Sequence, residues 1–188
     1  MPASYALDRG IALKRTFAAP ASVVFEAWTD PAYLDWYFNP DHPSEHPVTV
    51  DLRVGGQWRQ EMVETPEKRY FTGGVYREIV PGRKLAFYWG AVGGWPELDL
   101  DNLDESPLVT IQLTPYGAQT LMDFHVQFPD QYTPERVDWW MNCGMIAGWN
   151  MTIDRLVAVY EAERRAGQQV DRRPRYRPRN WGPSHRFR

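Results

Sequence analysis

Cysteine is nearly absent from this sequence: Cys143 is the only one among its 188 residues. One thiol cannot close a disulfide within the chain, and it cannot supply the several thiolates of a zinc finger or an iron–sulfur cluster. The sequence also lacks an apolar run of the about 20 residues that a membrane-spanning helix needs. Its first ten residues show no basic start followed by an apolar stretch, the pattern of a secretion signal. We therefore expect a cytoplasmic protein without a membrane span.

Aromatic residues, in contrast, are abundant. They make up 14% of the chain and include nine tryptophans, while hydrophobic residues reach 43% and charged residues 24%. This composition is typical of a soluble globular protein and excludes disorder of the whole chain. A length of 188 residues fits one domain of slightly more than typical size. We expect a single core that is rich in aromatic rings.

The net charge of −3 conceals a strong asymmetry along the chain. Residues 164–188 contain nine arginines against one acid, whereas residues 1–163 contain 12 cations and 23 acids, a net charge of −11. Proline and arginine dominate residues 167–188 and apolar periodicity stops there, so we predict a flexible tail. Its arginines, interleaved with Tyr176 and Trp181, suit phosphate contacts and base stacking, which makes nucleic acid one candidate partner. The alternatives are an arm that limits self-association and an arm that folds back on the acidic body.

Alternation of apolar and polar residues predicts seven β-strands. They span residues 11–17, 48–54, 57–63, 70–80, 84–90, 108–114 and 120–128. Gly55-Gly56 separates the second strand from the third, as a two-residue hairpin turn with positive φ requires. Between the first and second strands, Pro20 and Asp30-Pro31 each mark the beginning of a short helix. Residues 91–106 are glycine-rich and then acidic, and we predict a long surface loop there.

The last predicted element is a long amphipathic helix, which begins at Thr133-Pro134-Glu135. Its apolar positions recur every three or four residues from Val137 to Tyr160. Gly144 and Gly148 each cost about 1 kcal/mol of helix propensity relative to alanine. We therefore expect the helix to kink or break near Gly144.

The order of these elements, a strand, two short helices, six antiparallel strands and a long terminal helix, resembles the START-like, helix-grip architecture of the SRPBCC superfamily. Short motifs narrow the resemblance to the branch named for activators of the ninety-kilodalton heat-shock-protein ATPase. They are Arg15-Thr-Phe17, Val24-Phe-Glu-Ala-Trp-Thr-Asp-Pro31, Trp36, Val50-Asp-Leu-Arg-Val-Gly-Gly56, Gly74-Val-Tyr-Arg-Glu-Ile-Val-Pro81, Leu85, Trp89, Thr120, and Gly148-Trp149 followed by Asp154-Arg-Leu156. The acidic segment 91–106 and the arginine-rich tail depart from the pattern of that branch.

The resemblance implies an α+β fold in which a seven-stranded curved antiparallel sheet grips the long C-terminal helix. We expect this START-like domain to span residues 11–166, after an N-terminal segment of residues 1–10. It also implies an interior cavity between sheet and helix, which in many relatives admits apolar small molecules. It does not imply a reaction, because the superfamily includes lipid carriers, aromatic polyketide cyclases, hormone receptors and co-chaperone modules.

Eight aromatic and sulfur-containing residues are candidates for the lining of such a cavity, because ligand sites are mainly apolar and methionine adapts to irregular molecules. They are Trp28, Trp36, Trp58, Met62, Trp89, Phe124, Met145 and Trp149. The same residues would equally fill a solid core, since large rings fill space and their polar N–H groups need partners in either case. The sequence leaves these two alternatives open.

Glu61, Tyr88 and His125 are candidate polar groups of the cavity, each on a predicted strand. Alternation with Met62 and Phe124 places Glu61 and His125 on the opposite face of their strands, which favours a structural role for both. The sequence contains no nucleophile elbow, phosphate-binding glycine loop or paired-carboxylate motif. We therefore assign no catalytic residue and expect no cofactor.

Two segments contain residue types that bind metal ions. His42 and His46 resemble metal ligands by type, but Pro43 and Pro47 prevent the helix that would bring both imidazoles onto one face. The acids of residues 91–106 lack the glycine and the terminal glutamate of a calcium loop. We predict no metal site in either segment.

The leading functional hypothesis is binding of a small apolar or amphipathic molecule, such as a lipid, in a cavity between the sheet and the terminal helix. The first alternative is a co-chaperone-type module whose partner is a chaperone or another protein. The second alternative is an enzyme similar to a polyketide cyclase, which can work by holding a flexible chain in one conformation. The sequence does not name the ligand or the protein partner.

Overall fold

The computed structural model describes residues 4–6, 8–38 and 44–167, with the exception of the side chains of residues 35–38. Its strands are β1 (Gly10–Phe17), β2 (Thr49–Val50), β3 (Gln57–Val63), β4 (Arg69–Val80), β5 (Lys84–Trp89), β6 (Leu108–Tyr116) and β7 (Gln119–Gln127). Its helices are α1 (Ala21–Ala27), α2 (Pro31–Phe38), α3 (Pro134–Asn142) and α4 (Met145–Arg165), with a short 3-10 helix at Leu103–Glu105. None of the described helices is both long and apolar enough to cross a membrane. Residues 168–188, most of the predicted tail, lie outside the described residues.

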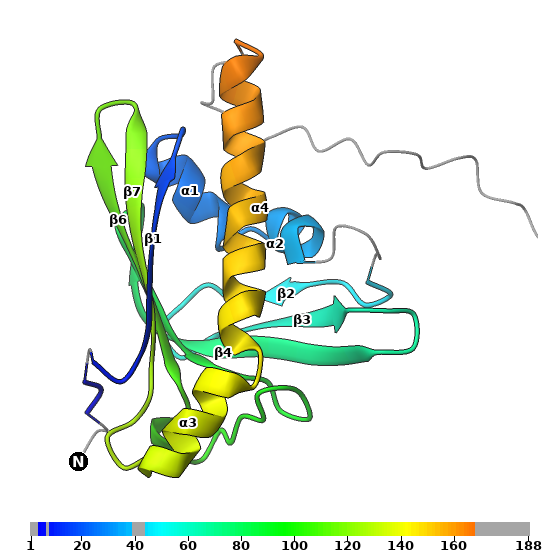
Figure 1. Ribbon diagram of the computed structural model, residues 1–188. Coiled ribbons are helices and arrows are strands. Elements are labelled where there is room, and N and C mark those ends of the chain that lie inside the picture. The colour runs from blue at the N-terminus through cyan, green and yellow to red at the C-terminus, as the bar shows by residue number, and fades with distance from the viewer. Residues whose placement is uncertain (1–3, 7, 39–43, 168–188) are drawn as a thin grey trace, which may run out of the picture.

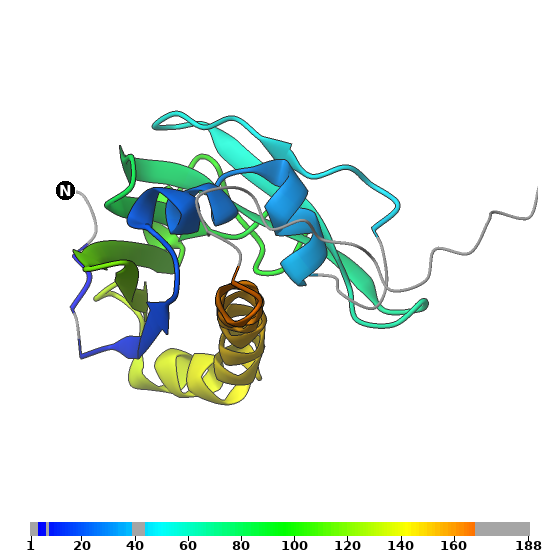
Figure 2. The ribbon, with the colours of Figure 1, turned by 90° about the horizontal axis from the view of Figure 1, so that it is seen from above.

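The strands form one antiparallel sheet in the order β1-β7-β6-β5-β4-β3-β2 (Figure 1). The sheet curves around α4, and α2 contacts both α4 and β3 (Figure 2). The two short helices between β1 and β2 and the helical region after β7 occur in the predicted order. The predicted α+β helix-grip fold is therefore confirmed.

The core lies between the concave face of the sheet and α4. Met122, Phe124 and Val126, alternate residues of β7, are almost fully buried, and the ring centroids of Phe124 and Trp149 lie 4.8 Å apart. Asp123 points to the outer face of the sheet, where Lys14 of the neighbouring β1 pairs with it at 2.6 Å. The alternation of apolar and polar residues therefore corresponds to the two faces of the sheet, as predicted.

One side of α4 is tied to the edge strand β1 by a charged and polar contact. Arg15 donates hydrogen bonds to Asp154 and to Asn150 of α4, both at 2.7 Å. Farther along α4, the buried ring of Tyr160 packs edge-on against Phe17, also from β1, with centroids 6.0 Å apart. These contacts hold α4 at the β1 side of the sheet.

The second strand is much shorter than predicted. β2 covers only Thr49–Val50, and Leu52 and Val54 are exposed. Residues 51–56 instead form a turn that docks on β4, where the Gly55 N–H donates to the Tyr76 carbonyl at 2.7 Å. Of the two glycines only Gly55 has a positive φ, of 80°, so the predicted two-residue turn is wrong. Alternation misleads here because neither face of residues 51–54 is buried.

Segment 91–106 is not simply a surface loop. Leu98 is almost fully buried, and the Trp95 ring packs against Trp89 and Trp140 with centroid distances of 5.4 and 5.9 Å. Tyr132 donates a hydrogen bond to the Glu105 carbonyl, which ties the segment to the chain before α3. The acidic residues of the segment suggested exposure, but Trp95 and Leu98 pack it against the end of the core.

The predicted break at Gly144 is confirmed. α3 ends at Asn142, Gly144 has a φ of 96°, and α4 begins at Met145. Gly148, four residues on, is an ordinary helical residue whose N–H donates to the Gly144 carbonyl at 3.0 Å. The two glycines therefore have different roles: Gly144 allows the chain to change direction, and Gly148 leaves open space beside α4 at its own position.

Substitution by alanine should separate these roles. Gly144→Ala should lower the free energy of unfolding by about 1–2 kcal/mol, because a Cβ is strained at positive φ. Gly148→Ala should leave stability unchanged or raise it by up to about 1 kcal/mol, because nothing lies within 4 Å of the added Cβ and alanine favours the helix. Urea denaturation measures both, and equal effects of the two substitutions would contradict the assignment.

Candidate functional site

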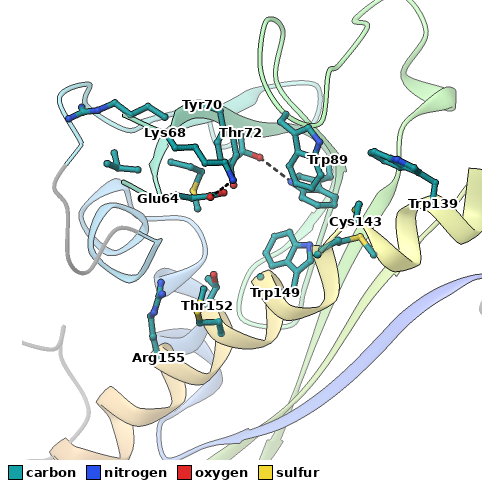
Figure 3. A pocket seen from close by; sticks show the side chains of 18 residues that line it. Glu64, Lys68, Tyr70, Thr72, Trp89, Trp139, Cys143, Trp149, Thr152 and Arg155 are labelled. Atoms are coloured by element: carbon teal, nitrogen blue, oxygen red, sulfur yellow. Dashed lines mark hydrogen bonds and ion pairs between the residues drawn. The ribbon is translucent and has the colours of Figure 1, made fainter. Parts of the chain in front are cut away.

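An open cavity of about 900 Å³ lies between the β3–β4 hairpin and the beginning of α4 (Figure 3). Its lining residues are Met62, Val63, Glu64, Lys68, Arg69, Tyr70 and Thr72 of the hairpin, Trp89 of β5, Trp95 of segment 91–106, and Trp139, Cys143, Gly144, Met145, Gly148, Trp149, Met151, Thr152 and Arg155 of the helical region. The cavity therefore joins the part of the sheet farthest from β1 to the first turns of α4.

Indole rings form one wall of the cavity. Trp89 contacts Trp149 and Trp95 edge-on, with ring centroids 5.2 and 5.4 Å apart, and Trp140 packs against both Trp89 and Trp95 from behind the wall. Such aromatic pairs add about 0.5–1.5 kcal/mol each beyond the area they bury. The wall is consequently fixed by its own contacts and presents aromatic surface to the cavity.

Four of the residues proposed from sequence lie in this lining. They are Met62 on β3, Trp89 at the end of β5, and Met145 and Trp149 on the first turns of α4. The side chain of Trp36 lies outside the described part of the chain, although its backbone belongs to α2.

Trp28, Trp58 and Phe124 do not line the cavity. Trp28 stacks on Phe124 at 5.9 Å, and Trp58 packs edge-on against Phe87 at 5.5 Å. All three side chains are buried in the core cluster that also includes residues of α1, α2 and α4. At these positions neighbouring rings occupy the space beside the side chains, which is the packing of a solid core.

Several lining residues were not predicted from the sequence. Trp95 lies in the segment that was expected to be a surface loop, and Thr152 carries no motif that points to a cavity. Tyr70 and Thr72 had a usable signal, since they alternate along β4 in phase with the buried Tyr76. The sequence does not show which strand borders a cavity and which borders packed side chains, because this depends on the tertiary arrangement.

The three candidate polar groups lie outside the cavity lining. His125 and Lys14 border a groove on the outer face of the sheet, and the Tyr88 hydroxyl donates to Asp104 at 3.4 Å. Glu61 points away from Met62, its neighbour on β3. The assignment of these residues to the cavity is therefore corrected, and strand alternation is the reason.

Glu61 instead holds the segment before β2 against β3. Its buried carboxylate accepts hydrogen bonds from the Ser44 hydroxyl at 2.9 Å and the Glu45 N–H at 3.0 Å, and His46 Nδ1 lies 3.2 Å away. Burial alone would raise the pKa of Glu61, but the hydrogen bonds from His46, Ser44 and Glu45 outweigh it and lower the pKa. The ionised carboxylate is the form that stabilises this contact.

The polar groups that do border the cavity come from the hairpin and α4. Lys68 pairs with Glu64 at the turn of the hairpin (Figure 3). Burial, together with the nearby Glu64 carboxylate, raises the pKa of Tyr70 to about 12, so its phenol stays protonated at neutral pH. Deeper in the cavity, the Thr72 hydroxyl accepts a hydrogen bond from Trp89 Nε1 at 3.1 Å.

The arrangement suits binding, with an apolar wall and a few polar groups. Cys143 borders the cavity, and its thiol donates to the Trp140 carbonyl at 3.2 Å. The described residues include no group of three or more histidine, cysteine, aspartate or glutamate side chains placed to hold a metal ion. The geometry can enclose an apolar molecule and offer it hydroxyl groups.

Comparison with known families agrees with this architecture. The family model described as "Activator of Hsp90 ATPase homolog 1-like protein" matches residues 18–161. The chain belongs to this family. The match covers α1, the sheet from β2 to β7 and nearly all of α4, and therefore includes every residue that lines the cavity. No curated protein matches the chain.

Solved structures share the fold of this family member. A protein from Nitrosomonas europaea superposes with a TM-score of 0.64 at 24% identity, covering 82% of this chain and 96% of that chain. An Arthrobacter aurescens protein gives 0.64 at 21% identity, over 85% and 91% of the two chains. A Chromobacterium violaceum protein has 28% identity and a TM-score of 0.56, over 80% and 96%. At these identities the likeness shows the fold and not the ligand.

The role of Glu61 gives a pH-dependent prediction. Because folding lowers its pKa, its contribution to stability is complete above the unfolded-state pKa, near 4.3, and is lost as the pH falls through the folded-state pKa. Glu61→Gln should therefore lower the free energy of unfolding by about 1–2 kcal/mol at pH 7, and this deficit should shrink as the pH falls below about 5. Denaturation at a series of pH values measures it.

Glu45→Gln is the matched control, because Glu45 is exposed and, among the described residues, its side chain pairs with Arg69 alone. It should change stability little at any pH. A deficit of Glu61→Gln that stays constant from pH 7 to pH 3 would contradict the proposed role of the ionised carboxylate.

Proposed function

We propose that this member of the activator of Hsp90 ATPase homolog 1-like family binds a small apolar or amphipathic molecule in the cavity between the β3–β4 hairpin and α4. The observation that carries the proposal is the cavity itself: about 900 Å³, bordered by Trp89, Trp95 and Trp149. This volume falls within the about 300–1,000 Å³ that is usual for small-molecule sites.

The chemistry of the lining supports an apolar guest. The lining includes the indole rings of Trp89, Trp95 and Trp149 and the thioethers of Met62 and Met145, and methionine adapts to irregular shapes. Transfer of apolar ligand surface from water to this lining is favourable by about 25 cal/mol per Å². Polar groups at the hairpin turn, such as Lys68 and Glu64, border the mouth and can remain solvated while the ligand occupies the interior.

Gly148 allows the cavity to be filled without touching its other residues. A Cβ at this position meets nothing within 4 Å, and Gly148 itself lines the cavity. We expect the unmodified protein to bind a lipophilic fluorophore such as Nile red at micromolar concentration and Gly148→Phe to weaken binding by at least about tenfold, since the ring occupies the ligand's space.

Gly148→Ala is the control, because it adds one methyl group and should retain binding. Quenching of tryptophan emission reports occupancy, and thermal unfolding checks that each variant is folded. Equal affinity of Gly148→Phe and the unmodified protein would place the dye elsewhere. A broad panel of lipophilic dyes that all fail to bind would refute the proposed function.

A second candidate is docking of a protein partner at the rim of the cavity. Trp139 and Met151 border the cavity, yet their side chains are 55% and 56% exposed. Aromatic residues and methionine are enriched where proteins meet. The family description points to a chaperone as the partner to test. Trp139→Ala should weaken retention of the chaperone in a pull-down. If the unmodified protein does not retain the chaperone, this candidate is contradicted.

A further inference from the structure

Two buried threonine hydroxyls border the cavity from opposite walls. Thr72 lies on β4, in the hairpin, and Thr152 lies on the second turn of α4 (Figure 3). Their exposed fractions are only 4% and 5%, although both residues line the cavity. Buried hydroxyls normally satisfy their hydrogen-bonding capacity within the protein or with a bound molecule. The partners of these two hydroxyls therefore indicate what the cavity accepts.

Thr72 uses only its acceptor capacity. Its Oγ1 accepts the Nε1–H of Trp89 at 3.1 Å, and this is the hydrogen bond that its side chain forms within the described part of the chain. A hydroxyl group has one donor proton besides its lone pairs, and the bond from Trp89 leaves that proton available. Because Trp89 orients the oxygen, Thr72 is positioned to donate a hydrogen bond to an acceptor atom in the cavity.

Thr152 has its hydroxyl available as well. A helical threonine usually donates to the carbonyl four residues before it, which here would be that of Gly148. Within the described residues the Thr152 side chain forms no hydrogen bond, and Figure 3 shows its oxygen directed into the cavity, toward the hairpin. A second donor therefore faces the cavity from the α4 side.

Flat aromatic surface lies between the two hydroxyls. Trp89, beside Thr72, and Trp149, one turn before Thr152, present aromatic surface between the two walls. The charged lining residues have partners within the protein: Lys68 pairs with Glu64, and Arg69 pairs with Glu45. Arg155, three residues after Thr152, also lines the cavity and is likewise engaged in an interaction within the protein. A rigid planar molecule fits between rings at a lower entropic cost than a flexible acyl chain, which must lose rotational freedom.

We propose that the cavity selects a flat, uncharged molecule that carries a hydrogen-bond acceptor oxygen on each of two opposite edges, and that Thr72 and Thr152 determine this selection by donating to the two oxygens. This inference rests on the proposed function, because it requires that the cavity binds a small molecule. It adds the chemical class of the ligand and assigns specificity to two residues that carry no sequence motif.

A pair of probes with the same three-ring frame tests the selection. Anthraquinone carries a carbonyl oxygen on each of two opposite edges, and anthracene carries none. We expect the unmodified protein to bind anthraquinone more tightly than anthracene. Thr152→Val should weaken anthraquinone by about fivefold, the effect of one lost hydrogen bond, and leave anthracene unchanged. Thr152→Ser retains the hydroxyl and should bind both probes as the unmodified protein does.

Thr72 is tested in the same way, with a precaution. Thr72→Val also removes the acceptor of the buried Trp89 N–H and can destabilise the fold, so the informative comparison is Thr72→Ser, which keeps the hydroxyl. If thermal unfolding shows that Thr72→Val is folded, this variant should bind anthraquinone about fivefold more weakly and anthracene with unchanged affinity. Thr152→Val leaves no described partner without its hydrogen bond and serves as the test if Thr72→Val does not fold.

The outcomes separate this inference from the function on which it rests. If anthracene and anthraquinone bind equally well and both valine variants leave the two affinities unchanged, the threonines do not select the ligand, while binding in the cavity stands. If oleate binds far more tightly than either probe, the ligand is a flexible chain and the inference is overturned. If neither probe, nor oleate, nor any lipophilic dye binds, the proposed function itself fails.

Discussion

The one-sided attachment of α4 is the constraint on which the rest of the structure depends. Arg15 ties Asn150 and Asp154 to β1, and Trp149 packs on Phe124 of β7. These contacts fix α4 at the β1–β7 side of the sheet. The hairpin of β3 and β4 lies toward the other edge of the same curved sheet. A straight helix cannot follow the curvature of the sheet across its whole width, and the space that remains between helix and hairpin is the cavity. The break at Gly144 lets α3 turn away instead of extending α4 past the edge of the sheet.

Most of the architecture could be predicted because it depends on local patterns. Alternation along β7 identifies its buried face. Thr133 marks the beginning of α3, because its side chain accepts a hydrogen bond from the Arg136 backbone N–H. The motifs shared with the family then order these elements into one fold. The prediction was wrong for residues 51–54, which alternate like a strand although neither of their faces is buried. It was also wrong for segment 91–106, whose acidic residues suggested an exposed loop although Trp95 and Leu98 pack against the core.

The site was less predictable, for a physical reason. Trp28 and Trp149 are alike in type and both are buried, yet only Trp149 borders the cavity, because α1 and the sheet close the space around Trp28. The sequence indicates which side chains become buried, but it does not indicate where the buried side chains leave a cavity between them. Glu61 could be placed on the outer face by alternation alone, whereas its hydrogen bonds with residues 44–46 depend on how the segment before β2 returns to the sheet. Thr72 and Thr152 become candidate ligand contacts only because the fold brings β4 and α4 to opposite sides of one cavity.

The central claim is that the gap between α4 and the hairpin persists as an accessible apolar cavity. A crystal of the protein pressurised with xenon tests this most directly, since xenon occupies apolar cavities without needing a specific hydrogen bond. The account predicts xenon density against Trp89 and Trp149, with the hairpin in the position described here. A hairpin packed directly onto α4, with its side chains filling the gap and no xenon between them, would contradict the account.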